Sequence, residues 1–364
     1  MRFFDTVAGR PLVASIDRSA FLHNLRYAES LSPMSETLVV LKANAYGHGA
    51  VALAKCVGNR RLAVACASEA KTLIDAGVRN PIMVLEGPFD ESCVTLSESS
   101  QITWVIHSRW QLNLLSKSTK NHSIWLKLDT GMHRLGLSSA ELAMAIRDVE
   151  TAENISIVGL FSHFASADEK NVGSVVKQIN QLDRLSEQFG LSDLPISLAN
   201  SGALMHYADA HRHLSRPGIM LYGGLPNNSD LDRVPQLKAV MNLDSAIIAL
   251  REIGIGESVG YGASWTAQRK SIIATIAIGY GDGYPRHAPN GTPVLIKQKL
   301  MPLVGRVSMD MITVDVTDLG DARVGDVARL WGKGLSADQI AKHAGTISYE
   351  LFTQLTMRVP RQYK

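Results

Sequence analysis

Amine and imidazole side chains stand beside short apolar runs in three parts of the chain. Lys42 closes the run TLVVLK, Lys127 lies within SIWLKL, and His163 follows SIVGLFS. A desolvated lysine amine can attack a carbonyl carbon, and an imidazole carries protons near neutral pH. Each residue also has an ordinary explanation, since lysines often end strands in solvent and a histidine can lie in a core with its hydrogen bonds formed there. The three predict a shared site only if a fold brings the ends of these runs together.

Three further polar groups come later in the chain. Ser201 closely follows the run ISLA, Arg216 stands before Pro-Gly-Ile-Met, and Tyr280 lies in the glycine-rich segment GYGDG at 279–283. Singly, these features fit a turn serine, a surface arginine and a hairpin. No one of them establishes an assignment alone.

Short apolar runs alternate with amphipathic stretches up to about residue 222, a pattern typical of parallel strands buried on both faces. The eight candidate strands are Thr37–Lys42, Leu62–Ala67, Pro81–Glu86, Ile102–His107, Ser123–Leu128, Ser156–Ser162, Ile196–Ala199 and Gly218–Tyr222. They predict an α/β fold, a (β/α)8 barrel, in which polar groups at the carboxyl ends of the strands meet on one face. A doubly wound open sheet gives the same local pattern, so alternation alone leaves both folds open.

Helix signals occupy the intervals between these runs. Ser138 and Glu141 have capping-box spacing ahead of LAMAIRDV, and Ser68 precedes a helix-like stretch that ends at Gly77. A further strand at Leu12–Asp17 would be a ninth, and we place it outside the barrel.

The sequence changes character after about residue 240. Alternating segments such as Ser271–Ile278 and Met309–Val316 are separated by glycine-rich turns, and one late helix is predicted at Ser336–Ala344. We therefore expect a barrel over residues 1–239 and a mostly β domain over residues 240–364. Residues 1–18 are candidates to pack with the second domain.

Composition narrows the class of protein. The 364 residues include 46% hydrophobic and 20% charged side chains, with a net charge of +3, which fits a folded globular protein and gives little support to nucleic-acid or membrane-surface binding. No apolar run approaches about 18 residues, and the N-terminus does not resemble a signal peptide. Three cysteines without a C-x-x-C pair argue against a disulfide framework or a zinc site. We expect a cytoplasmic enzyme.

Several longer motifs resemble one known family, the alanine racemases. They are KANAYGHG at 42–49, KLDTGMHRLG at 127–136, FSHFASAD at 161–168, Asn200-Ser201, RPGIMLYG at 216–223, IGYGDGYPR at 278–286 and GRVSMD at 305–310. The matches run in family order and extend over essentially the whole chain.

The resemblance implies a pyridoxal 5′-phosphate (PLP) enzyme with an N-terminal barrel and a C-terminal β domain. Lys42 would form the Schiff base with the cofactor and serve one face of the substrate carbanion, and Tyr280 would serve the other. In the family that tyrosine comes from the partner subunit, so a homodimer with shared sites is implied. A tyrosine has a reference pKa of about 10 and needs cationic or hydrogen-bonding neighbours to act near neutrality.

The remaining roles implied by the resemblance concern the cofactor and the substrate. Arg216 would face the pyridine nitrogen and leave it unprotonated, since a guanidinium does not easily release its proton. The other cofactor contacts would come from Tyr46, His163, Ser201, Gly218, Ile219 and Tyr222. Arg134 and the Met309 amide would lie near the ring oxygen and the substrate carboxylate, and Lys127 is a candidate for carbamylation. Some relatives have a tyrosine where this chain has Met357, so that phosphate contact is absent or replaced.

Alternatives to alanine racemisation remain at this point. Serine and broad-spectrum racemases share these motifs, and one methylene or hydroxyl changes pocket discrimination by only about 1–3 kcal/mol. A barrel-type decarboxylase would need a carboxylate at the ring nitrogen and a late cysteine, whereas the last cysteine here is Cys93. A non-catalytic PLP carrier would not need Tyr280, and GYGDG is not a dinucleotide fingerprint. The sequence does not separate a role in D-alanine supply for peptidoglycan from alanine catabolism.

Overall fold

The computed structural model describes residue 3 and residues 9–96, 101–169, 172–227 and 236–364. The chain forms two compact units. The barrel unit contains Leu25–Ala45 and Gly49–Leu221, and the β unit contains Met1–Asn24, Tyr46–His48 and Tyr222–Lys364. Each unit is described by itself below.

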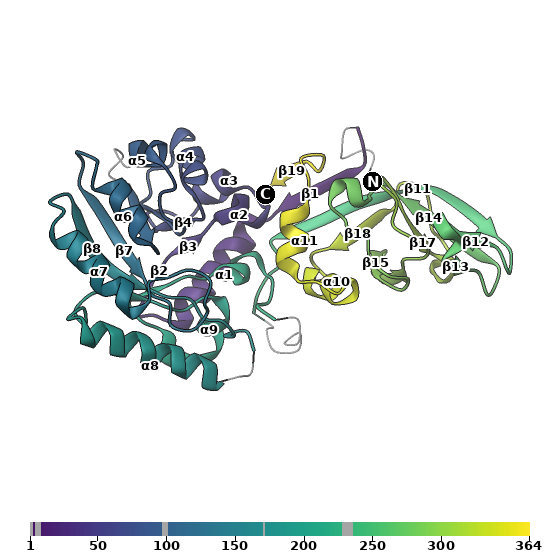
Figure 1. Ribbon diagram of the computed structural model, residues 1–364. Helices are drawn as coiled ribbons and strands as arrows, with labels where there is room; N and C mark the ends of the chain where they lie inside the picture. The colour runs from purple at the N-terminus through teal and green to yellow at the C-terminus, as the bar shows by residue number, and fades with distance from the viewer. Residues whose placement is uncertain (1–2, 4–8, 97–100, 170–171, 228–235) are drawn as a thin grey trace. The chain divides into compact units, whose positions relative to one another are not determined.

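The barrel unit is built on a parallel sheet. Its strand order is β2-β10-β9-β8-β7-β6-β5-β4-β3, with bounds β2 Glu36–Thr37, β3 Val39–Val40, β4 Leu62–Val64, β5 Ile82–Val84, β6 Ile102–Ile106, β7 His122–Lys127, β8 Ile155–Phe161, β9 Ile196–Ser197 and β10 Leu214–Ser215 (Figure 1). The two end strands, β2 and β3, are consecutive pieces of one segment. The Leu38 N–H donates to the carbonyl of Ser215 on one side, and the Leu41 N–H donates to the carbonyl of Ala63 on the other, both at 2.8 Å. This segment closes the sheet into a barrel and excludes the open doubly wound sheet.

The apolar content of the strands explains their place. Every residue of β4 and β5 is fully buried, as expected for strands covered on both faces. Helices separate the strands in the chain: α3 Ala50–Ala54, α4 Ala67–Asp75, α5 Glu91–Leu96, α6 Arg109–Leu115, α7 Ser139–Glu150, α8 Val172–Gln188 and α9 Ser201–His206. The predicted capping box of Ser138 and Glu141 begins α7. Helix α4 begins earlier than Ser68 predicts, with Cys66 as its N-cap.

The predicted eighth strand is wrong. Residues Ile219–Tyr222 form a 3₁₀ turn, η3, and the last barrel strand is the shorter β10, which pairs with β2 and β9. The run GIMLY is buried, and a short buried apolar run does not distinguish a strand from a helical turn by periodicity. Arg216 therefore follows the eighth strand directly instead of opening it.

The β unit is organised around a long strand, β11 (Met241–Ile253). It pairs with β1 (Leu12–Ile16), β14 (Ser271–Ile276) and β18 (Val327–Trp331), all antiparallel. β1 also pairs in parallel with β19 (Arg361–Tyr363), so the first strand lies in this sheet and outside the barrel. The other elements of the unit are β12 Ser258–Val259, β13 Trp265–Thr266, β15 Pro293–Ile296, β16 Lys299–Pro302, β17 Ile312–Asp315, α10 Ala337–Ala344 and α11 Ser348–Gln354. Helix α1 (Arg18–Leu31) begins in the β unit and ends in the barrel unit.

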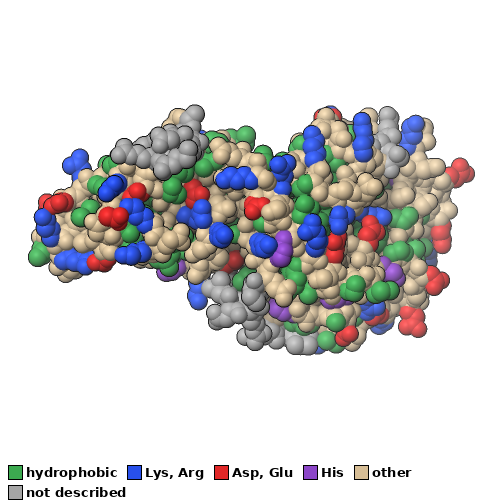
Figure 2. All heavy atoms as spheres, turned by 180° about the vertical axis from the view of Figure 1, so that it is seen from behind, with side chains coloured by type: hydrophobic (Ala, Val, Ile, Leu, Met, Phe, Trp, Pro, Cys, Tyr) green, Lys and Arg blue, Asp and Glu red, His purple; other side chains and the backbone are tan. Residues whose placement is uncertain are grey.

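Surface charges are mixed. On the face drawn in Figure 2, basic and acidic side chains are interspersed, in keeping with the small net charge. Within the described ranges, the structure contains no helix with the length and apolar content needed to cross a bilayer.

Candidate active site

Lys42 begins a left-handed turn at the end of the first barrel strand. Helix α2 (Lys42–Tyr46) has φ and ψ near +50° at Ala43, Asn44 and Ala45, and Tyr46 continues with φ 50°. The left-handed conformation costs an L-residue about 1–2 kcal/mol, or about 4–8 kcal/mol for the four. Backbone strain of this size persists only where the surroundings impose it, and it concentrates at functional sites.

The amine of Lys42 is buried among charges of both signs. It forms no hydrogen bond or ion pair with the residues described. Burial, Arg134 and Arg216 lower its pKa below the ordinary lysine value, whereas Glu86 and Glu69 act in the opposite direction. A lysine with a lowered pKa is more often neutral, and a neutral amine is the nucleophilic form.

Lys127 ends β7 on the same face of the barrel as Lys42. Its ammonium lies 5.7 Å from the centre of the Phe161 ring. Burial, Arg216, Arg134 and Lys42 together lower the pKa of Lys127 to about 8. Arg134, in the exposed loop after β7, forms no ion pair with a described residue.

Arg216 is buried at the carboxyl end of β10, with 4% of its surface exposed. Its Nη1 donates to Ser197 Oγ at 2.7 Å, and its Nη2 donates to the carbonyls of Ser162 at 2.7 Å and Leu198 at 3.2 Å. Burial lowers the pKa of Arg216 to about 9, so it remains a cation at neutral pH. Among the described residues, nothing accepts a hydrogen bond from Nε, so the Nε–H is available to a ligand.

His163 is held beside Arg216 in its neutral form. The Arg216 Nη2 lies 3.2 Å from His163 Nδ1, and burial with Arg216 as the nearest cationic influence lowers the pKa of His163 well below its usual range. Because the guanidinium can only donate, Nδ1 accepts, and the imidazole proton lies on Nε2. The guanidinium also lies over the Phe161 ring, 3.9 Å from its centre.

Backbone amides gather after the seventh and eighth strands. Ser201 Oγ accepts the N–H of Gly218 at 2.8 Å and that of Met220 at 3.4 Å. Ser201 begins α9 and Ile219 begins η3, and the first N–H groups of a helical segment have no partner within it. Barrels commonly bind phosphate at this position.

These barrel residues form one electrostatic environment. The positive charges of Arg134 and Arg216 lower the pKa values of Lys42 and Lys127, and the carboxylates of Glu86 and Glu69 partly offset this effect at Lys42. The excess of positive charge suits an anionic ligand. No group of His, Cys, Asp and Glu side chains suited to a metal ion occurs in the ranges that the structure describes.

Tyr46 and Tyr222 belong to the β unit. Their rings stack with centroids 4.7 Å apart, and both side chains are buried. Burial raises the pKa of Tyr46, so its phenol stays protonated and can donate a hydrogen bond. Gly47, which follows Tyr46, packs against Phe352 so closely that a Cβ there would lie 2.1 Å from the Phe352 carbonyl oxygen. Met357 is 94% exposed.

Tyr280 lies on a 3₁₀ turn, η6 (Tyr280–Asp282), and the hairpin reading of GYGDG is wrong. The N–H of Tyr280 donates to the Ser308 carbonyl at 3.0 Å, and the N–H of Gly281 donates to the Met309 carbonyl at 2.8 Å. The sequence-predicted residues Tyr280 and Met309 are thus neighbours, 40% and 53% exposed. The Met309 N–H has no partner among the described residues.

A buried carboxylate fastens this turn. Asp282, fully buried, accepts the Gly279 N–H at 2.9 Å and pairs with Arg10 at 2.5 Å and Arg358 at 3.4 Å. Arg358 also pairs with Asp310 at 2.7 Å. The positive charge of Arg358 is therefore neutralised by two carboxylates.

A second exposed tyrosine was not singled out by the sequence. Tyr261 is 70% exposed on the turn η5 (Tyr261–Ala263), where Gly260, Gly262 and the non-glycine Ala263 have φ of 73°, 71° and 45°. The Arg306 guanidinium packs on this turn, since a Cβ on Gly262 would lie 3.0 Å from its Nη1. Arg306 forms no ion pair with a described residue. The only signal in the sequence was a tyrosine between two glycines, which also fits an ordinary turn.

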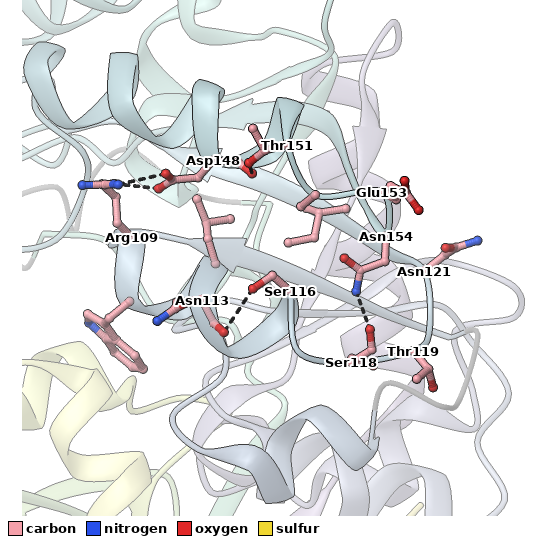
Figure 3. A pocket seen from close by; sticks show the side chains of 14 residues that line it. Arg109, Asn113, Ser116, Ser118, Thr119, Asn121, Asp148, Thr151, Glu153 and Asn154 are labelled. Carbon is pink, nitrogen blue, oxygen red and sulfur yellow. Dashed lines mark hydrogen bonds and ion pairs between the residues drawn. The ribbon is translucent and has the colours of Figure 1, made fainter.

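One large cavity lies away from this site. It measures about 990 Å³ and is lined by polar residues that precede β7 and β8, so it lies at the amino ends of those strands (Figure 3). Arg109 and Asp148 bridge α6 and α7 at one side of it, and Asn154 donates to the Ser118 carbonyl at 2.8 Å. Lys127 and His163 lie at the carboxyl ends, where barrel enzymes place their chemistry.

Comparison with known proteins agrees with this geometry. Residues 16–226 match the family model of the alanine racemase N-terminal domain, and residues 240–363 match that of the C-terminal domain. The chain belongs to the alanine racemase family.

Relatives within the alanine racemase family resemble the chain over nearly its full length. The alanine racemase of Chromohalobacter salexigens is 44% identical over 360 residues, 98% of each chain. The crystal structure of the biosynthetic alanine racemase of Pseudomonas aeruginosa has a TM-score of 0.91 at 42% identity, over 98% of this chain and 100% of that one. A catabolic alanine racemase of Pseudomonas putida is 42% identical over 97% of this chain and 99% of the relative. Similarity therefore does not separate the biosynthetic role from the catabolic one.

Proposed function

We propose that this protein interconverts L- and D-alanine in the cytoplasm, with PLP bound at the carboxyl face of the barrel. The observation that carries the proposal is the convergence of Lys42, whose pKa is lowered, with the buried Arg216 in a chain of this family. When bound, PLP supplies the electron sink that makes removal of the alanine Cα proton feasible.

The donors in the barrel unit fit the cofactor. Lys42 would hold it covalently, the unpartnered Nε of Arg216 would donate to the ring nitrogen, and Ser201 with the amides of Gly218 and Ile219 would bind the phosphate. Tyr46 and Tyr222 would complete the cofactor site. Because the guanidinium remains charged and can only donate, it would keep a proton off the ring nitrogen, which favours proton return over side reactions.

Substrate binding would use two groups that have no ion-pair or hydrogen-bond partner among the described residues. Arg134 carries a positive charge that no described carboxylate neutralises, and the Met309 N–H is free to donate. A guanidinium and an N–H are suited to the alanine carboxylate. Met309 would come from a second copy of the chain, as would the tyrosine discussed next.

Racemisation needs a second proton carrier opposite Lys42, and we assign it to a tyrosine of the β unit. Tyr280 is the residue expected from the sequence, but two observations favour Tyr261. The guanidinium of Arg306, which packs on Gly262 next to Tyr261 in the chain, has no described counter-ion. Arg358, beside the turn of Tyr280, is paired with Asp282 and Asp310. A guanidinium without a counter-ion remains available to an anionic group of a ligand at this turn. Tyr261 also lies on a turn with positive φ at a non-glycine residue.

The matched variants Tyr261→Phe and Tyr280→Phe test this assignment. Each is incubated with L-alanine and with D-alanine in D₂O, and inversion is measured separately from deuterium uptake at Cα. We expect Tyr261→Phe to lower inversion by about 10²–10⁴-fold. Uptake without inversion should continue for the enantiomer whose Cα proton faces Lys42, and Tyr280→Phe should change inversion much less.

The reverse result would assign the second carrier to Tyr280 instead. Inversion near the parent rate in both variants would contradict the use of either tyrosine. No inversion in the parent protein, with deuterium uptake from serine or another amino acid, would assign the same site to a different substrate.

A further inference from the structure

The left-handed turn after Lys42 is fastened by one carboxylate from a neighbouring βα loop. Glu69, in the first turn of α4, accepts the Ala43 N–H on Oε1 at 2.6 Å and the Ala65 N–H on Oε2 at 2.8 Å. Ala65 directly follows β4, so the side chain links the ends of two adjacent barrel strands. A charged acceptor forms stronger hydrogen bonds than a neutral one.

The orientation of Glu69 is unusual for its place in the helix. A glutamate at the third helical position commonly bonds the N–H of its own N-cap residue, as Glu141 does with Ser138 in α7. Glu69 instead reaches outward to the turn that carries Lys42, although the N-cap residue Cys66 provides no side-chain cap to α4. The positive end of the α4 dipole favours a charged carboxylate at this position.

Neutral contacts hold the rest of the turn. The Ala45 N–H donates to the Leu41 carbonyl at 2.7 Å, Asn44 Oδ1 accepts the Ala50 N–H at 2.9 Å, and the Asn44 carbonyl accepts the Gly49 N–H at 2.9 Å. Glu69 differs from these partners because it is a charged side chain; just beyond the turn, Arg361 Nε donates to the Gly47 carbonyl at 3.3 Å.

We propose that Glu69 is a positioning residue, whose carboxylate holds the strained turn in place and thereby fixes the Lys42 amine relative to the cofactor. The placement of the Lys42 amine relative to PLP rests on the proposed function, because it assumes that PLP binds at this site. The fastening of the turn is a property of the chain itself.

Electrostatics gives Glu69 a second effect on Lys42, which a control variant can separate. Arg134 and Arg216 lower the pKa of Lys42, whereas Glu86 and Glu69 raise it. The charge of Lys42 in turn lowers the pKa of Lys127. Glu86, half-buried like Glu69, forms no side-chain hydrogen bond with a described residue. Glu86→Gln therefore removes a comparable charge without touching the turn.

The experiment measures amide hydrogen exchange in peptides covering residues 41–47, without PLP, for the parent, Glu69→Gln, Glu69→Ala and Glu86→Gln. Loss of a charged hydrogen bond should accelerate exchange at the turn by about tenfold or more in Glu69→Ala and by less in Glu69→Gln. Exchange in Glu86→Gln should match the parent. Peptides from β7 and β8 report whether the barrel as a whole has remained folded.

Loading with PLP then separates positioning from charge. The pH midpoint of the bound-PLP absorbance should move in the same direction in Glu69→Gln and Glu86→Gln, because both lose one negative charge near Lys42. Only the Glu69 variants should also lose at least about tenfold in kcat for alanine with a smaller change in KM.

Parent-like exchange at residues 41–47 in both Glu69 variants would overturn the proposal, as would equal acceleration in Glu86→Gln. Accelerated exchange in the Glu69 variants, together with a parent protein that does not racemise alanine, would support the fastening of the turn and contradict the proposed function. The two failures are therefore distinguishable.

Discussion

At the scale of single residues, the site depends on burial of cations beside one another. Arg216, with a pKa of about 9, remains charged at neutral pH and is surrounded by three oxygen acceptors. Burial, together with the positive charges of Arg216 and Lys127, lowers the pKa of His163. The result is a neutral imidazole and two lysines with lowered pKa values in one electrostatic environment. At a given pH, both lysines are therefore in the neutral, nucleophilic form more often than an exposed lysine is.

Lys127 should become carbamylated at alkaline pH. With a pKa of about 8, about half of its amines are neutral at pH 8, against well under about 1% for an ordinary lysine, and only the neutral amine adds to CO₂. Protonation below pH 8 removes the reactive form, so carbamate should decline as the pH falls from 8 to 6. The measurement is the carbamate ¹³C NMR signal in ¹³C-bicarbonate, with Lys127→Arg as the cationic control. An equal signal in Lys127→Arg would assign carbamylation to another amine.

At the scale of elements, most of the barrel was predictable because apolar runs mark buried parallel strands. Seven of the eight candidate runs overlap a barrel strand, and Lys42, Lys127 and His163 lie at or just beyond strand ends. The eighth strand was misplaced because GIMLY is apolar for a different reason, as a buried 3₁₀ turn. The left-handed turn at 43–46 was not predictable, since Asn44 is its only residue of a type that favours positive φ, and the alanines and the tyrosine carry no such signal.

Only part of the site was predictable from the sequence. Motif resemblance found the residues that bear the chemistry, but not those that act through distant contacts. Glu69 lies 26 residues beyond its partner Ala43, and Asp282 lies 272 residues from Arg10. Tyr261 was missed because its significance depends on Arg306, which only the folded turn brings beside it.

Asp282→Asn should weaken the turn that carries Tyr280. The substitution removes the charge that pairs with Arg10 and Arg358, and it should lower the free energy of unfolding by about 1–3 kcal/mol. This loss is smaller than that for a fully buried ion pair, because both arginines are partly exposed. The measurement is the denaturant midpoint.

Asp318→Asn is the matched control, because it breaks an exposed pair with Arg269 and should leave the midpoint unchanged. Equal midpoints for the two variants would contradict a structural role for Asp282.

At the scale of the whole molecule, the β unit exposes several large side chains, including both candidate tyrosines. Tyr261, Tyr280, Met309 and Met311 are each at least 40% exposed, and large exposed apolar side chains often mark interfaces. A homodimer in which each β unit serves the partner's barrel would cover them.

Mixing two inactive variants tests such sharing. Lys42→Ala and Tyr261→Phe should each have little activity alone. A heterodimer of the two would contain one site with both defects and one with neither, so random exchange should restore about a quarter of the parent activity. The activity is measured after the mixed variants have been unfolded and refolded together. No recovery, with heterodimers demonstrated by mass, would contradict a shared site.

Chiral analysis of L-alanine incubated with the PLP-loaded protein, with Lys42→Ala alongside, is the most direct test of alanine racemisation at this site. We predict that the parent protein brings L-alanine to an equal mixture with D-alanine and that Lys42→Ala yields no D-alanine and lacks the bound-PLP absorbance. A parent protein that binds PLP but forms no D-alanine would contradict alanine as the substrate. D-Alanine formed equally by Lys42→Ala would contradict the assignment of the active site itself.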